Sequence, residues 1–233
     1  TFRMTSNALA ANPSWVDLTA NLPINNEPVD IEVDPTDPTH LFIALGGNIY
    51  ESSNSGVSWI DISGTLPDIS LNTIVIDQDS PVEAKYIGMD VGVYYLDNTM
   101  SDWVMYSTGL PNLEITELEI HYNDTECKST LYAATYGQGL WKADLKDPGN
   151  VATVACFEAS ATDICMGQMV TFSDNSSYTP TSWLWTITPS TFSVVGGTNA
   201  NSKNPQVQFL ATGSYNVQLQ AANATGSDTL TKN

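Results

Sequence analysis

Among the side chains of this sequence that could take part in chemistry, carboxylates are the most numerous. The 233 residues include 26 Asp and Glu, seven Lys and Arg, and two His. Two facing carboxyl groups can cleave a glycosidic bond. The spacing along the chain singles out no converging pair. Asp90, which stands between Gly88 and Gly92, is a candidate, but a solvated aspartate in a turn is the simpler interpretation.

Oxygen-rich turns are a second chemical feature. Asp34 and Asp37 stand in "DPTDP", and Asp174 stands in "SDNSS". Clustered oxygen ligands suit a hard cation such as Ca²⁺, whereas two prolines in the first segment favour a simple turn. We keep these three aspartates as candidate calcium ligands and expect no other cofactor.

Other reaction types have little support in the sequence. One arginine, Arg3, cannot build a multi-arginine clamp for a carboxylate substrate. Neither a G-x-S-x-G elbow nor a G-x-x-x-x-G-K-[ST] phosphate loop occurs. Without a C-x-x-C pair, the cysteines and histidines do not predict a zinc site. We interpret His40 as a surface-loop residue and His121 as a structural residue at the end of a strand.

The three cysteines leave two interpretations open. Cys156 and Cys165 are nine residues apart and flank "FEASATDI". They would form a disulfide in an exported protein, and two buried thiols are the alternative. Cys127 is then left over.

The charge is unevenly distributed along the chain. Residues 1–148 hold 22 acidic and five basic residues, whereas residues 149–233 hold four and two. Such a shift indicates two domains, which we place at 1–147 and 148–233, with "KDPGN" as the linker. A strongly acidic surface repels phosphate backbones, so no nucleic acid partner is expected. No apolar run approaches the roughly 20 residues of a membrane span.

Internal repeats predict the fold of the first domain. Trp15, Trp59 and Trp103 are each 44 residues apart, and each is followed seven residues later by Leu-Pro. The units share an alternating segment ("DIEVD", "TIVID", "ELEIH") and two β-rich runs separated by Gly. Four short strands per unit of this length are typical of a β-propeller blade. We expect the three tryptophans to occupy equivalent environments.

Three repeats are fewer than the smallest propellers contain. "TFRMTS" is predicted to be a third strand, and the last unit, 112–145, supplies three strands, with Trp141 in its closing hairpin. We therefore expect residues 1–147 to be the C-terminal part of a larger propeller, of about three four-stranded blades. The missing blades would be its partner.

The stretch "SSNSGVSW" fits the pattern Ser-x-Asp-x-Gly-x-x-Trp through Ser52, Asn54, Gly56 and Trp59. The hydroxyl and amide would bond nearby backbone, Gly56 would accept a positive φ, and the indole would cover the hairpin. The pattern resembles the Asp-box, or BNR repeat, of sialidase-like and sortilin-type propellers, and the likeness covers roughly residues 1–147. It implies a structural turn between the third and fourth strands of a blade, away from any active site.

Residues 148–233 contain about seven short runs of β-forming residues separated by Gly, Pro and Asn. This rhythm predicts an Ig-like β-sandwich. "CMGQMVTFSDNSS", "SWLWTIT" and the run from Phe209 to Leu219 resemble a PKD domain, although "WTITP" replaces the usual W-x-F-G-D. Trp183 and Trp185 alternate, so we expect one in the core and the other at its edge.

Together these features predict an all-β chain, a partial propeller followed by a PKD-like sandwich. The resemblance implies a non-catalytic spacer or recognition module for glycans or cell-surface proteins. Its expected setting is a secreted or surface protein of Bacteroidetes-type bacteria, exported across the outer membrane by type IX secretion. Two alternatives stay open: the C-terminal part of a secreted glycoside hydrolase, and an adhesin or gliding-motility protein.

Overall fold

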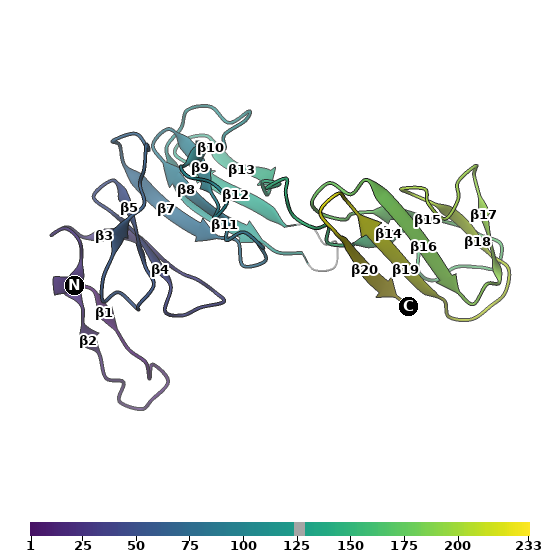
Figure 1. Cartoon of the computed structure of the whole chain (residues 1–233), viewed down its shortest axis with the longest axis horizontal. Coiled ribbons are helices and arrows are strands. Elements are labelled where there is room, and N and C mark those ends of the chain that lie inside the picture. The colour runs from purple at the N-terminus through teal and green to yellow at the C-terminus, as the bar shows by residue number, and fades with distance from the viewer. Residues whose placement is uncertain (124–128) are drawn as a thin grey trace. The chain divides into compact units, whose positions relative to one another are not determined.

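The computed structural model describes residues 1–123 and 129–233, which form β-strands joined by turns and one short 3₁₀ helix, η1 (Thr19–Asn21). The chain divides into two compact units (Figure 1). The first unit comprises residues 1–120 and 131–143, and the second is built mainly from residues 144–233. The predicted all-β class is confirmed. Within the described residues, no helix is long and apolar enough to cross a membrane.

Two complete four-stranded antiparallel sheets form the centre of the first unit, and in both the strands follow one another in chain order. The first sheet contains β3 (Pro28–Val33), β4 (Leu41–Leu45), β5 (Asn48–Ser52) and β6 (Ile60–Asp61). The second contains β7 (Leu71–Ile76), β8 (Lys85–Met89), β9 (Gly92–Leu96) and β10 (Val104–Met105). The 44-residue repeat is therefore one sheet per unit.

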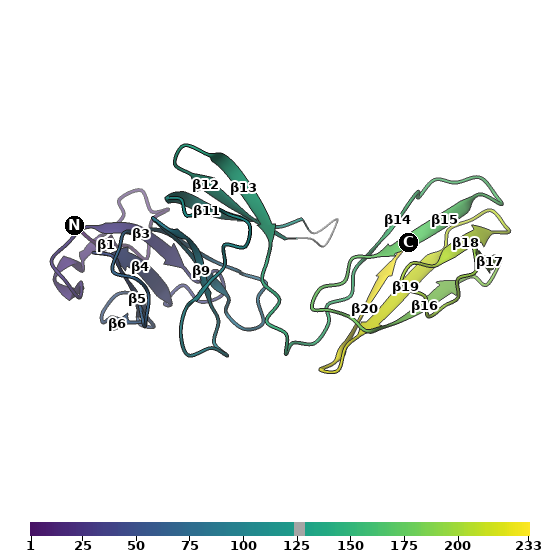
Figure 2. The ribbon, with the colours of Figure 1, turned by 90° about the horizontal axis from the view of Figure 1, so that it is seen from above.

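Two smaller sheets flank this pair in sequence. One pairs β1 (Arg3–Met4) with β2 (Val16–Asp17). The other contains β11 (Ile115–His121), β12 (Thr130–Thr135) and β13 (Gly139–Asp144), which Figure 2 shows side by side. A strand in "TFRMTS" and three strands in 112–145 were expected, and β1 and β11 to β13 lie at these positions. The described structure thus has two complete blades of this type rather than three.

A tight turn explains how β4 and β5 pair. Leu45 faces Asn48 in the register, so only Gly46 and Gly47 lie between the strands. Their φ angles are +65° and +87°. A two-residue hairpin of this kind needs positive φ at both central positions, which glycine adopts at the least cost.

Successive sheets pack face to face through apolar side chains. Phe42, Ala44 and Ile49 of the first sheet share a core cluster with residues of the second, namely Leu71, Ile74, Ile76, Ile87, Met89 and Trp103. On the far face of the second sheet, a Cβ built on Gly88 would lie 2.6 Å from Ile115 of β11. Glycine at this position therefore lets β11 approach closely.

The first strands of successive sheets also lie next to one another. The backbone N–H of Ile74 on β7 donates to Asp30 Oδ2 of β3 at 2.8 Å. Asn72 Nδ2 donates to the backbone oxygen of Ile115 on β11 at 3.1 Å. β3, β7 and β11 consequently form one continuous inner row of the first unit.

The second unit is a sandwich of two antiparallel sheets. Its four-stranded sheet has the order β14 (Phe157–Ala159), β15 (Met169–Asp174), β18 (Gln206–Phe209) and β17 (Phe192–Val195). Its three-stranded sheet has the order β16 (Ser182–Thr188), β19 (Asn216–Ala222) and β20 (Ser227–Lys232).

The core of the second unit is aromatic. The ring of Trp185 stacks on Phe172 with centroids 5.6 Å apart, and Phe157 meets it edge-on at 5.1 Å. The indole N–H of Trp185 donates to the backbone oxygen of Ser202 at 3.0 Å, which satisfies its polar atom inside the core. Trp183 lies on the same face and is only partly buried, as the alternation predicted.

Candidate functional site

The turn between β5 and β6 is built from the residues that the repeat pattern singled out. The buried hydroxyl of Ser52 accepts the backbone N–H of Gly56 at 2.9 Å and donates to Asn54 Oδ1 at 3.0 Å. Asn54 Oδ1 in turn accepts the backbone N–H of Ser58 at 2.9 Å. Two short polar side chains thus satisfy the donors of a turn that has no ladder partner.

Gly56 is required by space as well as by conformation. Its φ is +79°, and a Cβ there would lie 2.8 Å from the ring of Phe2 and 3.3 Å from Trp59. The two rings meet edge-on, with centroids 5.9 Å apart. Trp59 also packs on the cluster of Ile43, Leu45 and Tyr50, so the indole covers the outer part of the first sheet.

Trp15, Trp59 and Trp103 do not occupy equivalent environments, so the expectation that they do is wrong. Trp15, Trp59 and Trp103 each precede the short last strand of a sheet, but Trp15 is 57% exposed and Trp103 only 6%. Trp103 packs into the core shared with the first sheet and donates to the backbone oxygen of Ile62 at 2.8 Å. For Trp15, no described sheet lies in the corresponding place. Trp141 lies within β13 and precedes no fourth strand.

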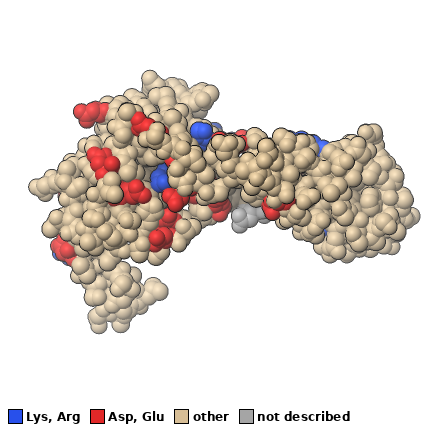
Figure 3. All heavy atoms as spheres, viewed as in Figure 1, with Lys and Arg blue, Asp and Glu red and all other residues tan. Residues whose placement is uncertain are grey.

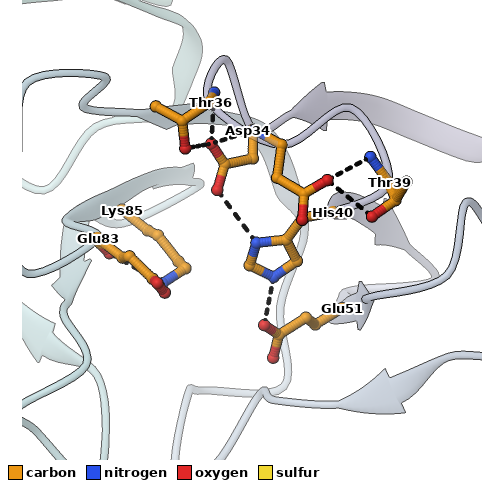
Figure 4. A network of polar contacts seen from close by, with 8 residues as sticks. Asp34, Thr36, Thr39, His40, Glu51, Glu83 and Lys85 are labelled. Atoms are coloured by element: carbon orange, nitrogen blue, oxygen red, sulfur yellow. Dashed lines mark hydrogen bonds and ion pairs between the residues drawn. The ribbon is translucent and has the colours of Figure 1, made fainter.

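A histidine held between two carboxylates lies beside this turn (Figure 4). His40 Nδ1 is 3.1 Å from Asp34 Oδ2, at the end of β3, and His40 Nε2 is 2.6 Å from Glu51 Oε1, on β5. The side chain is only 14% exposed, so its interpretation as a surface residue is wrong. The neighbouring loop is bound to the turn by Ser55, whose N–H donates to the backbone oxygen of Thr39 at 2.8 Å.

The hydrogen bonds of His40 set its charge. Burial alone would lower the pKa of His40, but hydrogen bonds to Glu51 and Asp34 outweigh burial and raise the pKa above its ordinary value. Burial would raise the pKa of Asp34, yet bonds from Thr36 and His40 hold it below its usual range. When the imidazole is protonated, it donates to both carboxylates at once and links the end of β3 to β5.

A buried lysine lies close to the same cluster. Lys85 Nζ donates to the backbone oxygen of Glu83 at 2.8 Å and is 3.8 Å from Glu83 Oε2. It also lies 5.3 Å from the centroid of the Phe42 ring, which is 4.6 Å from the His40 ring. The apolar stem of Lys85 fills space between sheets while its ammonium stays paired, which indicates a packing role.

The inner row of strands carries carboxylates. Asp30 and Glu32 lie on β3, and Glu117 and Glu119 lie on β11. Burial, followed by the charges of Asp30, Glu119 and Glu117, raises the pKa of Glu32 to about 7, against the lowering effect of a hydrogen bond from the Ile76 backbone. Figure 3 shows that acidic side chains gather mostly over the first unit on the face drawn.

The candidate calcium ligands are engaged in local hydrogen bonds. Asp34 Oδ1 accepts the N–H and hydroxyl of Thr36, and Asp37 Oδ1 accepts those of Thr39. Asp174 Oδ1 accepts the N–H of Ser176 at 3.2 Å and lies in the other unit. Among the residues that the structure describes, no group of three or more His, Cys, Asp or Glu is arranged to hold a metal. Each of the three aspartates therefore accepts hydrogen bonds within its own turn.

Both interpretations of Cys156 and Cys165, a bond between them and two buried thiols, are wrong. Cys165 is a free, exposed thiol, whereas Cys156 is buried and disulfide-bonded. Cys156 adjoins Asn175 at one end of the β14–β15 hairpin, and Cys165 adjoins Gln168 at the other. The six residues of β15 lie between Gln168 and Asn175, so the two ends are roughly 23 Å apart, far beyond the reach of a disulfide. The leftover Cys127 lies outside the described residues.

Several solved structures resemble this chain over most of its length, at low sequence identity. The extracellular domain of a one-component system from B. thetaiotaomicron is 11% identical, with a TM-score of 0.43 over 94% of this chain and 32% of that one. The extracellular domain of a hybrid two-component system from the same organism is 10% identical, with a TM-score of 0.43 over 94% of this chain and 33% of that one. A GH74 xyloglucanase from Xanthomonas campestris is 15% identical, with a TM-score of 0.36 over 64% of this chain and 27% of that one. The chain spans about a third or less of the length of these structures.

The sequence comparisons concern the second unit. A search among curated proteins finds no match. Residues 156–233, which form the sandwich of β14 to β20, match the family model of the PKD domain.

Proposed function

We propose that this chain is a non-catalytic recognition and spacer module of a secreted or cell-surface protein. The observation that carries the proposal is the PKD match over residues 156–233, which points to an extracellular or surface protein. The first unit would present the ligand-binding surface, for glycans or for proteins of a cell surface. The PKD-like sandwich would hold that surface away from the rest of the assembly.

The polar clusters of the first unit support a structural role. His40 joins β3 to β5, and Ser52 and Asn54 close the turn to β6. We propose that residues 52–59 are an Asp-box of the BNR type, with Asn54 in the place of the aspartate. Such a turn fixes the periphery of a blade, and side chains that bond to one another in this way are not available to a substrate.

A glycan array with the 233-residue chain tests the recognition role. Saturable binding to a restricted set of glycans, with every bound glycan recovered intact, is the expected result. Release of shortened products would contradict a non-catalytic module. Absence of binding to glycans directs the same assay to purified cell-surface proteins, and absence of binding to both contradicts recognition altogether.

One observation favours a second candidate, part of a secreted glycoside hydrolase. Burial, followed by the charges of Asp30, Glu119 and Glu117, raises the pKa of Glu32 to about 7, and a general acid of such an enzyme needs a raised pKa. If this candidate holds, Glu32→Gln abolishes product release while the exposed Glu27→Gln does not. If the first proposal holds, neither substitution changes glycan binding, and no product forms.

A further inference from the structure

The second unit contains a cavity of about 750 Å³ at one end of its sandwich. Two loops line it, residues 161–166 between β14 and β15 and residues 211–215 between β18 and β19. β14 and β20 also contribute, and they are edge strands of the two sheets. The volume lies within the range of roughly 300–1,000 Å³ that small-molecule sites have, so the cavity can hold an organic ligand.

The inner wall of this cavity is the hydrophobic core of the sandwich. Ile164 and Tyr215 line it, are partly buried and pack against the core cluster. Met166, on the outer side, is 65% exposed. The core residues that line it are almost inaccessible to solvent: Phe157, Val170, Phe172 and Val217. An apolar ligand body that enters the cavity therefore leaves water for a largely aromatic surface.

The walls of the cavity are held in place without a ligand. The N–H of Gly167 donates to the backbone oxygen of Phe209 at 2.9 Å, which ties the first loop to β18. The rings of Phe209 and Tyr215 are 4.3 Å apart between centroids. Lys232 Nζ donates to the backbone oxygen of Phe157 at 2.8 Å and so links β20 to β14. Because these contacts already order the walls, a ligand does not have to order them on binding.

The rim of the cavity carries two carboxyl groups that have no partner. Asp163 is exposed, and Glu158 alternates with the buried Phe157 along β14. Neither carboxyl group forms a hydrogen bond or an ion pair with another residue that the structure describes. The ammonium of Lys232 is engaged with the Phe157 backbone and lies 5.3 Å from the centroid of its ring. The rim thus has an excess of negative charge over an apolar interior.

We propose that this cavity binds an organic ammonium ion with an aromatic or aliphatic body. The body packs against the core residues of the inner wall, and the ammonium group pairs with Glu158 and Asp163 at the rim. An anion of the same shape meets two like charges there, and a neutral molecule leaves both carboxylates unpaired. The cavity lies in the sandwich, so this site is separate from the recognition surface proposed for the first unit and does not depend on it.

Three probes that share one body test the charge preference. Phenethylamine, phenethyl alcohol and hydrocinnamate carry a positive, a neutral and a negative group on the same phenylethyl body. In calorimetric titrations of the full 233-residue chain, the amine should bind most tightly and hydrocinnamate least tightly. Added salt should weaken binding of the amine and not that of the alcohol, because salt screens the attraction between exposed charges.

Cys165 reports whether the probe occupies the cavity itself. Its thiol is free and exposed, and the residue lines the cavity. Saturating phenethylamine should slow the labelling of Cys165 by a maleimide in proportion to its occupancy of the site. This local measurement is needed because the chain has 26 acidic and seven basic residues, so amines also gather elsewhere on its surface.

Substitutions at the rim separate the two parts of the site. Glu158→Gln and Asp163→Asn should each weaken binding of phenethylamine about twofold to fivefold, as expected for an exposed ion pair, and leave phenethyl alcohol unaffected. Glu27→Gln, an exposed position in the first unit, is the matched control and should change nothing. Ala161→Phe fills the cavity and should abolish binding of all three probes. Ala224→Phe, exposed in the turn between β19 and β20, should not.

Four results overturn the proposal. They are equal affinity for the three probes, tighter binding of hydrocinnamate, which would make Lys232 the anchor of an anion site, binding of none of the probes, and binding that leaves the labelling of Cys165 unchanged. If Ala161→Phe does not fold, as judged by circular dichroism, the labelling of Cys165 in the wild-type chain still decides where the probe binds.

Discussion

The two complete sheets of the first unit share one topology, but different polar side chains stabilise the turn after the third strand of each. In the first sheet, the residues after the third strand form the Ser52, Asn54 and Gly56 turn, and His40 bonds Asp34 and Glu51. In the second sheet, Asp97 fills the comparable place: its Oδ1 accepts the N–H of Thr99 at 2.9 Å and its Oδ2 accepts the hydroxyl of Tyr95 at 2.5 Å.

The difference shows which parts of the repeat the fold depends on. Strand alternation and sheet-to-sheet packing are kept in both sheets, because an apolar residue in the wrong place exposes a whole face. The polar closure varies, because any side chain that satisfies the donors of the turn suffices. The tryptophan before the last strand is kept in sequence, but its contribution depends on what covers it.

Replacing the tryptophans should have the largest effect on stability. It should also show most clearly that residues at equivalent places in the repeat contribute differently. Trp103→Ala removes an indole from the core between sheets and a hydrogen bond to Ile62, so we expect a loss of about 3–5 kcal/mol of unfolding free energy. Trp59→Ala should cost about 1–3 kcal/mol, and the exposed Trp15→Ala less than about 1 kcal/mol. Urea titrations followed by circular dichroism measure all three. Equal losses would mean that the packing described for Trp103 is wrong.

The turn after β5 should be the next most sensitive place. Ser52→Ala leaves the buried N–H of Gly56 without its acceptor, which should cost about 1–3 kcal/mol. The neighbouring Ser53→Ala, an exposed position, is the matched control and should stay within about 0.5 kcal/mol. Thermal unfolding of the two variants provides the comparison. If the Ser52→Ala variant is as stable as the Ser53→Ala control, the Ser52 hydroxyl does not stabilise the turn.

The pH dependence of stability should distinguish the two polar clusters of the first unit. His40 has a raised pKa in the folded chain, so its contribution is fully present below its ordinary value of 6.5 and is lost as the pH rises through the folded value. Glu32 keeps its proton up to about pH 7 in the folded chain and loses it near 4.5 when unfolded. Folding therefore also becomes less favourable from 4.5 to about 7.

Both groups thus make the first unit less stable as the pH rises from about 5 to 8. Glu32→Gln should flatten the curve mainly below pH 7, and His40→Gln should flatten its upper part. Denaturant midpoints measured at a series of pH values check this. Stability that increases with pH in the wild type would contradict the charge assignments of both residues.

The smallest effect is expected at Cys165. The thiol is exposed and unpaired, so Cys165→Ser should change the unfolding free energy by less than about 0.5 kcal/mol. In the native chain a maleimide should label Cys165 and leave the disulfide-bonded Cys156 unmodified. Protection of Cys165 from the reagent would reinstate the bond that the sequence suggested.

Much of the fold could be predicted from the sequence because it rests on local patterns. The 44-residue spacing, the alternation in "DIEVD" and "TIVID", and the glycines at 46 and 47 each specify a strand or a turn within a few residues. The alternation of Trp183 and Trp185 likewise placed one in the core of the sandwich. These patterns need no knowledge of what lies opposite.

The candidate site could not be predicted in the same way, because it depends on contacts between residues that are far apart in the sequence. His40 is held by Glu51, eleven residues away, which lies 2.6 Å from its Nε2, and the sequence does not show that these two side chains meet. Cys156 and Cys165 are close in sequence but are held apart by an extended hairpin. The raised pKa of Glu32 depends partly on charges of Glu117 and Glu119 that reside on a strand some 85 residues later. Each feature is set by tertiary packing.

Backbone hydrogen exchange at Gly56 and Ser58 tests most directly whether the polar residues of this turn are structural. Their N–H groups donate to Ser52 Oγ and Asn54 Oδ1, so both should exchange slowly in the wild type. In Ser52→Ala their protection should fall at least about tenfold, while the N–H of Tyr106, bonded to Val93 in the other sheet, keeps its own. Rapid exchange of Gly56 and Ser58 in the wild type would contradict the account.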